Sequence, residues 1–583
     1  MDFFRKKENI YAVAALIGGL FLLFLIPPFQ VPDEEGHHQR AWEVASGHFL
    51  CSENKRSTIP YSAQQLPANI KENGSFDGSA FIPSAVPWKN VANIKPDFRP
   101  VEVGMTNFCG TNPIGYVPAA IGLDMGRFLN LPAIHSFYLG RLISLIVSIF
   151  LVYWAVRLAP FGKNIFMFVG LFPMALQQFA SLSYDASSIS LGLFFLAYAL
   201  KLGTQKNIEN RQWIFAFIIS MILLSIKPGY YAFCGLIFLW YPMYKDRPKI
   251  FVRNTALFLL GSVMVALLNY HVFKAPEEIW PYRVMPDTQM SFVLHHPMHF
   301  LSAVSNTLDE RGMSFLTNMI GKLGPLLVDM PDTVLIGAFI LIFIILRGAD
   351  DEKFSLSRLQ RLILLSIFVV NVLFVFLIIY VIWTAVSDDE VVGVQGRYFI
   401  SSFPLLLFAF YGVILNREIR RRIVVIGCIL LLFFGIFSAY EFYYEKGRGT
   451  YREKTSDGIV PEAIMQHEEK TITQTLVAKE KNLSKIYFIV ADNEKMPKIK
   501  AELKDALCEK VLRRDEVSFS KDNDLYVANF GVIPESYGTK YCLVISTASR
   551  PIEVEIVAGN AYEGGELLNS DDKDLRFEIE YKK

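Results

Sequence analysis

The sequence carries almost no net charge. Its 57 lysines and arginines are balanced by 56 aspartates and glutamates, which leaves a formal net charge of +1. Nucleic-acid-binding domains carry a clear basic excess, so we expect no nucleic-acid partner. The sequence also lacks a Gly-rich phosphate loop, a CxxC pair, an HExxH motif and a convincing Ser-His-Asp signature. These absences exclude the usual cytosolic ATPase, zinc protease and serine hydrolase.

Cysteine is scarce, with six in 583 residues. Two lie inside apolar runs, and four lie in two polar regions. If both polar regions face an oxidising compartment, the pairs Cys51–Cys109 and Cys508–Cys542 can form disulfides. Spacing alone does not fix pairing, so four free thiols are the alternative.

What the sequence does have is apolar length. It is 52% hydrophobic, with a mean hydropathy of +0.32, which indicates a polytopic membrane protein, mainly α-helical. The first apolar run, about 10–28, follows Arg5, Lys6 and Lys7 and has no small-x-small cleavage site. It predicts a retained transmembrane helix with its N-terminus inside. Further runs bring the total to about eleven spans: 135–156, 164–182, 186–203, 212–226, 230–244, 254–272, 333–347, 361–384, 398–415 and 422–441. Some are short for a span, and one broken hairpin over 212–244 is the alternative there.

Basic residues cluster in alternate connections between these runs, and such connections are usually cytoplasmic. The large loops 29–132 and 273–331 are then outside, as is the C-terminal region. We therefore predict a transmembrane domain over 1–444 and a second domain over 445–583. Short segments with period-two alternation predict that the second domain is an extracytoplasmic β-sandwich.

An acidic, His-bearing stretch emerges directly from the first apolar run. Pro32 suits the first position of a helix, and in that helix Asp33, His37 and Arg40 share one face. Glu34 and Glu35 add carboxylates. This stretch predicts chemistry at the membrane surface, and a solvated helix cap is the alternative.

Four further charged residues stand at the predicted outer ends of apolar runs: Arg141, Asp185, Lys227 and Arg397. A charge at membrane depth normally faces a cavity or a partner, so we expect a charged cavity on the outer side. Lys227 and Arg397 each stand beside a glycine and tyrosines, Tyr398 among them, a setting that suits a phosphate. Asp185 can neutralise one of the two cations, and snorkelling helix-end charges are the alternative for each.

Two pairs of adjacent histidines, His37–His38 and His295–His296, raise the question of a metal site. Adjacent histidines point in different directions, and no further ligand has metal-site spacing. We therefore predict no metal ligands in this sequence.

As an ordered set, several blocks resemble a family of bacterial predicted membrane proteins that has long been described as a domain of unknown function. The blocks are Pro28–Glu34 with His37 and Arg40, Leu139–Arg141, Phe172–Ala186 and Gln395–Phe399. The likeness covers about residues 10–440. Glu35 stands where members often carry proline, which adds a third carboxylate and leaves open which of the three is the base. The family is similar to GT-C glycosyltransferases, which take sugar from a polyprenyl-phosphate donor outside the membrane.

The resemblance implies a mechanism. Asp33, with Glu34 in reserve, is the general base on an acceptor hydroxyl, and configuration inverts. Arg397, Lys227 and Arg141 bind the donor phosphate, supported by His37, Arg40, Asp185 and Tyr398. The acceptor is a cell-envelope glycan, teichoic acid, lipid or protein, and the enzyme lies in the bacterial cytoplasmic membrane. No cofactor is required, although a divalent metal ion can assist.

Two other functions compete with this prediction. A transporter or flippase for a lipid-linked glycan would use the same basic cavity, but would need polar groups along a whole path. A non-catalytic envelope assembly protein would not need Asp33.

Overall fold

The computed structural model divides into two compact units, residues 1–68 with 89–440 and residues 69–88 with 441–583. The structure describes residues 6–50, 56–73, 76–77, 80–81, 92, 94–104, 106–272, 284–346, 356–412, 421–445, 450–454, 464–478, 482–488, 499–520, 525–534, 536, 538–547, 552–558, 573–575 and 577–582.

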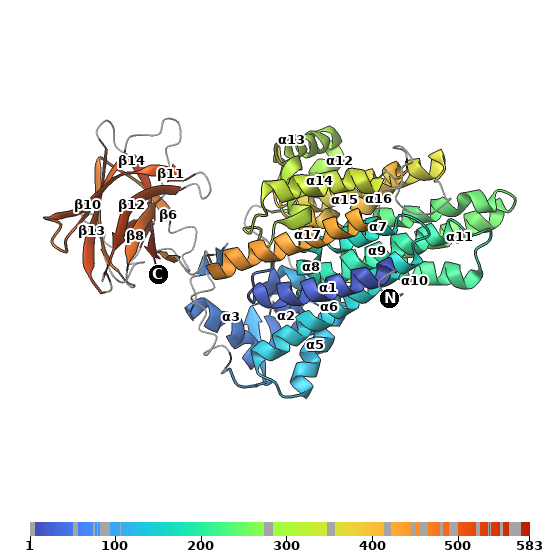
Figure 1. Cartoon of the computed structure of the whole chain (residues 1–583), viewed down its shortest axis with the longest axis horizontal. Coiled ribbons are helices and arrows are strands. Elements are labelled where there is room, and N and C mark those ends of the chain that lie inside the picture. Colours follow the sequence, from blue (N-terminus) through green and yellow to red (C-terminus); the bar gives the residue numbers. More distant parts are fainter. Residues whose placement is uncertain are drawn as a thin grey trace. The chain divides into compact units, whose positions relative to one another are not determined.

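The first unit is mainly helical (Figure 1). Six of the described helices are long and apolar enough to cross a membrane: α1 (Lys7–Leu25), α6 (Ala133–Leu158), α9 (Tyr184–Leu202), α11 (Pro248–Val272), α15 (Arg358–Ile382) and α17 (Arg421–Tyr440). The prediction of a multi-pass, mainly helical membrane protein is therefore confirmed.

Helix α1 packs against both α6 and α17 (Figure 1). Two glycines allow the close approach: a Cβ on Gly18 would lie 2.5 Å from a methyl of Leu432, and one on Gly19 would lie 2.6 Å from a methyl of Leu145. Small residues at helix contacts are typical of membrane proteins, because close packing replaces the hydrophobic driving force there.

The remaining apolar runs are shorter or broken. Two form the helices α10 (Asn210–Ile226) and α14 (Asp332–Leu346). Three runs that we predicted as single spans are not continuous α-helices: 164–182 is α7 (Lys163–Gly170) and α8 (Pro173–Phe179), 230–244 is the 3-10 helix η5 (Pro228–Tyr244), and 398–415 includes η7 (Gly396–Phe399) and α16 (Phe403–Phe410).

Proline explains two of these differences. Pro173 and Pro404 stand at the first or second position of their segments, where a missing N–H is tolerated, whereas a preceding helix cannot run through them. Hydropathy alone does not register such breaks. Pro228 stands at the first position of η5, at the break that the sequence already showed between 226 and 230.

The two polar loops contain helices and strands of their own. The first holds α2 (Glu34–Ala45), β1 (Arg56–Pro60), α3 (Tyr61–Asn73), β2 (Phe76–Asp77), β3 (Ala80–Phe81), β4 (Pro100–Gly104), η3 (Asn107–Gly110), η4 (Pro113–Tyr116) and α5 (Val117–Phe128). Strands β1 and β4 form an antiparallel pair, as do β2 and β3. The second loop contributes α12 (Pro286–His295) and α13 (Pro297–Gly321).

The C-terminal region begins with a π-helical turn, η8 (Glu441–Glu445), and continues as antiparallel sheets. The strands are β5 (Thr450–Lys454), β6 (Ile464–Glu469), β7 (Thr471–Val477), β8 (Leu483–Phe488), β9 (Ile499–Lys504), β10 (Val511–Glu516), β11 (Ser518–Ser520), β12 (Leu525–Ile533), β13 (Lys540–Thr547), β14 (Ile552–Ala558), β15 (Lys573–Leu575) and β16 (Phe577–Lys582).

Their orders are β10-β9-β13-β7, β11-β12-β8-β16-β5 and β15-β14-β6. The two larger sheets both contribute side chains to one buried apolar cluster, for example Leu543 from the first and Ile486 from the second. Alternation along the strands, which places every second side chain on this cluster, is the property that the sequence displayed.

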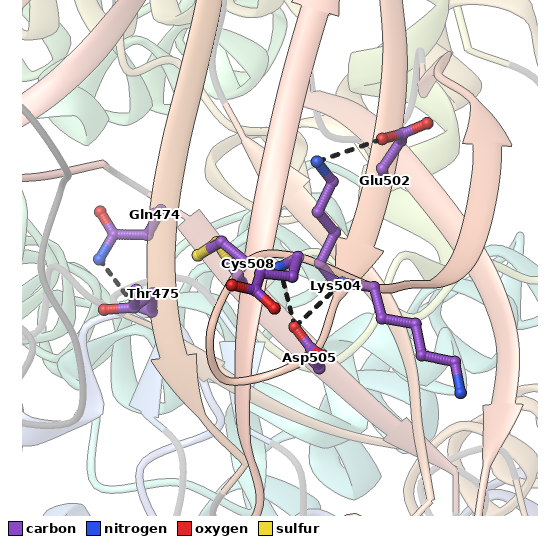
Figure 2. Close-up of a disulfide and its surroundings, with 9 residues drawn as sticks. Gln474, Thr475, Glu502, Lys504, Asp505 and Cys508 are labelled. Carbon is purple, nitrogen blue, oxygen red and sulfur yellow. Dashed lines mark hydrogen bonds and ion pairs between the residues drawn. A yellow bond between two sulfur atoms is a disulfide. The ribbon is translucent and has the colours of Figure 1, made fainter.

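Cys508 and Cys542 form a disulfide across 34 positions, with their Cα atoms 5.3 Å apart. Figure 2 shows Cys508 in the loop beyond Lys504, at the end of β9. Cys542 lies on β13, in register with Thr475 of β7 and Lys504 of β9. One of the two predicted pairings is therefore present. Cys109 is also disulfide-bonded, whereas Cys51 lies outside the described residues.

Candidate functional site

The chain turns sharply between α1 and α2, and this turn presents Asp33. Phe29 and Asp33 both have left-handed backbone, with φ of 63° and 62°, a conformation uncommon outside glycine that aspartate tolerates better than most residues. Asp33 occupies the capping position of α2 but makes no capping hydrogen bond. Its side chain is 45% exposed, so the carboxylate is accessible.

Glu34, the next residue, is buried in an ion pair with Arg141 of α6, and neither side chain is exposed. Arg141 Nε donates to Glu34 Oε1 at 2.8 Å, and Nη2 donates to Oε2. The other three N–H groups of Arg141 donate to the carbonyls of Leu23, Ile26 and Pro27. All five donors of this guanidinium therefore have partners within the protein.

Glu34 is held equally firmly. Its Oε2 accepts a hydrogen bond from the Phe29 N–H at 3.0 Å, and its Oε1 accepts one from the Leu182 N–H at 3.4 Å. The pair with Arg141 thus joins the end of α1, the start of α2, α6 and the segment before α9. It fixes the turn on which Asp33 stands.

Asp33 belongs to a second, separate arrangement in which charges alternate. Arg397 Nη2 lies 2.7 Å from Asp33 Oδ2, and Arg397 Nε lies 3.2 Å from Asp185 Oδ2. Lys227 Nζ donates to Asp185 Oδ1 at 2.6 Å. We call Asp33, Arg397, Asp185 and Lys227 the charged cluster. Asp185 and the Arg397 side chain are nearly fully buried, and the Lys227 side chain is 14% exposed.

One donor of the cluster stands out. Arg397 Nη1 is buried and has no hydrogen-bond partner among the described residues. A buried guanidinium N–H without a partner costs more than 1 kcal/mol, in order of magnitude. Such groups are rare in native proteins and call for a further partner, such as a bound ligand.

Tyrosine rings cover the two cations. Lys227 Nζ lies 4.2 Å from the centroid of the Tyr398 ring and 5.3 Å from that of Tyr184, and the guanidinium carbon of Arg397 lies 5.2 Å from the Tyr398 centroid. Aromatic faces stabilise cations through the ring quadrupole. They also bring hydroxyl groups close to the cluster.

Gly396 explains how Arg397 reaches this place. A Cβ on Gly396 would lie 2.5 Å from the backbone nitrogen of Met319 and 2.9 Å from Cβ of Asn318, both on α13. Only glycine lets η7 approach the backbone of α13 this closely. The requirement for glycine immediately before the arginine is therefore one of packing.

His37 lies one turn into α2, behind Asp33. Its Nδ1 lies 2.8 Å from the Tyr116 hydroxyl, and its ring packs on Phe108 and Tyr184. Burial lowers the pKa of His37 to about 4, although the carboxylates of Asp33 and Asp185 oppose the shift. A histidine with this pKa is neutral at pH 7, so it contributes a hydrogen bond rather than a charge.

His38 and Arg40 point elsewhere. The His38 Nε2 accepts a hydrogen bond from the Trp42 indole at 3.1 Å, and burial lowers the pKa of His38 to about 3. Arg40 is fully buried and donates to Glu43 at 2.7 Å, and to the carbonyls of Phe49 and Thr111 at 2.7 and 3.0 Å. Arg40 therefore fastens α2 to the rest of the first loop.

The structure brings together four of the predicted site residues as the charged cluster, with Tyr398 and His37 beside it. It places Glu34 with Arg141 in the separate buried pair, and Arg40 in a third contact set. Sequence reasoning did not single out Tyr184 or Tyr116. Tyr184 adjoins Asp185 in one of the recognised blocks, but no signal in the sequence pointed to Tyr116.

Among the described residues, no group of three or more His, Cys, Asp or Glu side chains is arranged to hold a metal ion. The His295 imidazole bonds back to the Ser291 carbonyl of its own helix.

Residues 16–409 match the model of a family described as predicted membrane protein (DUF2142). None of the curated protein sequences matches the chain. The matched region contains the buried pair and the whole charged cluster, and it covers more than half of the chain. The protein therefore belongs to the DUF2142 family of predicted membrane proteins.

Proposed function

We propose that the protein is a membrane glycosyltransferase that moves a sugar from a polyprenyl-phosphate donor to a cell-envelope acceptor, such as a glycan, teichoic acid, lipid or protein. The observation that carries the proposal is the charged cluster. A half-exposed carboxylate, Asp33, stands against the nearly buried guanidinium of Arg397, which has an N–H without a partner among the residues that the structure describes. Base and anion-binding group thus lie side by side, as transfer from a phosphate requires.

The charge balance of the cluster suits an anionic donor. Two carboxylates face two cations, so the cluster is neutral without a ligand. A polyprenyl-phosphate sugar is a phosphodiester with one negative charge, and it can replace Asp33 as the partner of Arg397. Arginine offers paired N–H groups to a phosphate, and Arg397 Nη1 has no hydrogen-bond partner in the described part of the chain. Donor binding would then release Asp33 from its ion pair just when a base is needed.

The transfer proceeds by a single displacement. Asp33 takes the proton of the acceptor hydroxyl, whose oxygen forms a bond to the anomeric carbon. The bond from that carbon to the phosphate oxygen breaks on the opposite face, and its electron pair leaves with the polyprenyl phosphate. The configuration inverts. Arg397 and Lys227 stabilise the charge that grows on the departing phosphate.

The other predicted residues act indirectly. Arg141 has no N–H group left for the phosphate of the substrate, because all five bind Glu34 or the carbonyls at the end of α1. Glu34 is likewise held by Arg141. We assign them the positioning of Asp33. Asp185 holds Arg397 and Lys227 at a fixed separation, and His37 with Tyr116 supports α2 from behind.

The proposal also specifies how the protein lies in the membrane. About eleven apolar segments lie in the bilayer in a GT-C-like arrangement, and the N-terminus is cytoplasmic. The disulfide Cys508–Cys542 supports an extracytoplasmic C-terminal β-sandwich, because structural disulfides persist in oxidising compartments. The charged cluster would lie on this outer side of the bacterial cytoplasmic membrane. The reaction needs no cofactor, and a divalent cation can assist the leaving phosphate.

The test is transfer by the purified full-length protein in detergent. The purified protein is incubated with a polyprenyl-phosphate hexose, whose hexose is radiolabelled, and with an envelope fraction as the acceptor. The radioactivity that appears in the polymer or protein fraction is then measured. Transfer supports the enzyme. A flippase cannot produce it, because detergent leaves no barrier to cross. No transfer from any polyprenyl-phosphate hexose, with the donor bound, would favour the transporter.

A further inference from the structure

Helix α5 (Val117–Phe128), in the first polar loop, has two different faces. One is buried and made of small and aliphatic residues: Ala119, Ala120, Gly122, Leu123 and Gly126. The other exposes an apolar stripe at helical spacing: Val117 (42% exposed), Ile121 (49%), Met125 (42%) and Phe128 (89%). Residues four or three positions apart lie on one side of a helix, so this stripe is continuous. We call these four residues the α5 stripe.

The buried face fixes the position of α5 against α6. A Cβ on Gly122 would collide with the backbone of Leu139 and Gly140, and one on Gly126 would collide with Ser136. As the α5 numbers rise the α6 numbers fall, so the two helices are antiparallel. Residues 122–126 lie beside residues 136–140.

This position can be related to the bilayer. Arg141 binds the carbonyls of Leu23, Ile26 and Pro27 at the end of α1, so the ends of the α1 span and of the membrane-embedded part of α6 coincide near Arg141. Residues 136–140 extend about 2–8 Å beyond it at 1.5 Å per residue. The headgroup region on each side of a bilayer is about 5–8 Å thick. The middle of α5 therefore falls at headgroup depth.

The charges of α5 are compatible with that depth. Asp124 and Arg127 form an ion pair with each other, and Arg127 also donates to the carbonyl of Ala45 at 3.2 Å. Both charges of the helix are thus partnered at the edge of the stripe. Helix α5 is too short to span a membrane, since a span needs about 20 residues.

We propose that the α5 stripe is immersed in the outer headgroup region of the bilayer, with lipid as its partner. Interfacial helices bury an apolar face at the boundary between headgroups and acyl chains. Because α5 packs antiparallel to α6, the depth of the stripe in the bilayer changes along the helix. Val117 lies nearest the hydrocarbon, and Phe128 lies farthest from it. Because η4 and Tyr116 directly precede α5, this contact would hold one wall of the His37 environment at a set height above the membrane.

The experiment measures depth with nitroxide spin labels. Val117, Ile121, Met125 and Phe128 are each replaced by cysteine in the full-length protein, in a background in which the buried free cysteines Cys234 and Cys428 are alanine. Each variant is labelled and reconstituted into phosphatidylcholine–phosphatidylglycerol vesicles. Collision of each label with oxygen, which concentrates in lipid, is compared with collision with a water-soluble nickel chelate.

Two reference sites calibrate the measurement. Phe150→Cys on α6, where the native side chain is 58% exposed on a candidate span, gives the lipid value. Arg99→Cys, where the native side chain is 79% exposed, gives the water value. We expect an oxygen-to-nickel ratio several-fold above that of the Arg99 site at Val117, with a decrease through Ile121 and Met125 to Phe128. Water-like ratios at all four positions would overturn the proposal and leave the stripe to a soluble partner, and a reversed or flat order would overturn the depth assignment.

Discussion

Arg397 and Asp33, 364 positions apart in the sequence, meet at 2.7 Å. The contact joins the turn after the first helix to the short η7 segment near the end of the matched family region. It pairs the nearly buried guanidinium of Arg397 with the half-exposed carboxylate of Asp33. The proposed chemistry depends on this pair being broken by a substrate, which makes it the first target for mutation.

Replacing Asp33 with Asn should abolish sugar transfer with little effect on folding. Asparagine keeps the shape and accepts the left-handed backbone but cannot take a proton, and loss of a general base costs about 10²–10⁴-fold in rate. Transfer and thermal unfolding are measured together. The matched control is Glu35→Gln, an exposed carboxylate two positions away, which should transfer normally. Unchanged transfer by D33N would refute the base assignment and favour the assembly-protein alternative.

Replacing Glu34 or Arg141 should act on stability. Removing one partner leaves a buried charge without compensation, at a cost of about 3–5 kcal/mol, so Glu34→Gln and Arg141→Leu should lower the melting temperature markedly in detergent. Arg141→Lys should not rescue, because lysine has three donors for the five contacts that arginine makes here. A stable, donor-bound E34Q protein that fails only in catalysis would instead make Glu34 the base.

Stability should fall as the pH drops below about 6.5. The folded-state pKa values of His37 and His38 are lowered by burial to about 4 and about 3, so between pH 6.5 and these values the unfolded chain binds more protons than the folded one. From pH 7.5 to 5, each histidine should remove about 2 kcal/mol from the free energy of unfolding.

Thermal unfolding at the two pH values tests this expectation. His38→Gln removes one titrating group and keeps an acceptor for Trp42, so the variant should lose less stability on acidification than the native protein. An equal pH dependence in both proteins would show that His38 does not titrate as its burial requires.

Replacing Gly396 with Ala should displace Arg397. The added methyl would lie against the backbone of α13, which cannot yield as a side chain can, and overpacking of this kind costs about 1–3 kcal/mol. Donor binding should weaken together with stability. Gly337→Ala on α14, where a Cβ meets nothing within 4 Å, is the control and should be neutral or slightly stabilising. If G396A bound the sugar donor normally, the packing of η7 against α13 would not be needed to position Arg397 for binding.

Breaking the Cys508–Cys542 disulfide should destabilise the C-terminal region alone. Closing a loop of 34 positions contributes about 3–4 kcal/mol in the chain-entropy account. Serine at both positions should therefore increase protease cleavage within residues 441–583 and leave the helical unit intact. Cleavage that spreads through the helical unit would contradict the division into two units.

The sequence predicted the helices best where apolar length alone decides the structure, as in α1, α6 and α15. It failed at Pro173 and Pro404, because hydropathy averages over a window and does not register a lost N–H. Asp185, Lys227 and Arg397, three of the four charges that we expected to share a cavity, lie together, whereas Arg141 lies in a separate pair with Glu34. Which charge pairs with which was not predictable: Glu34 and Asp33 are neighbours in sequence, yet their partners are Arg141 and Arg397. Only the backbone turn, with its left-handed residues, sends the two carboxylates apart.

The Arg141 contacts also impose an order on biogenesis. The carbonyls of Ile26 and Pro27, just after α1, accept hydrogen bonds from Arg141, which is synthesised more than a hundred residues later. The partner of Asp33, Arg397, is synthesised later still. The carbonyls at the end of α1 therefore lack the hydrogen bonds from Arg141 until α6 inserts into the bilayer beside α1. The cluster is complete only when nearly the whole membrane unit has been synthesised, so a chain cut short before η7 would carry Asp33 without the arginine that faces it.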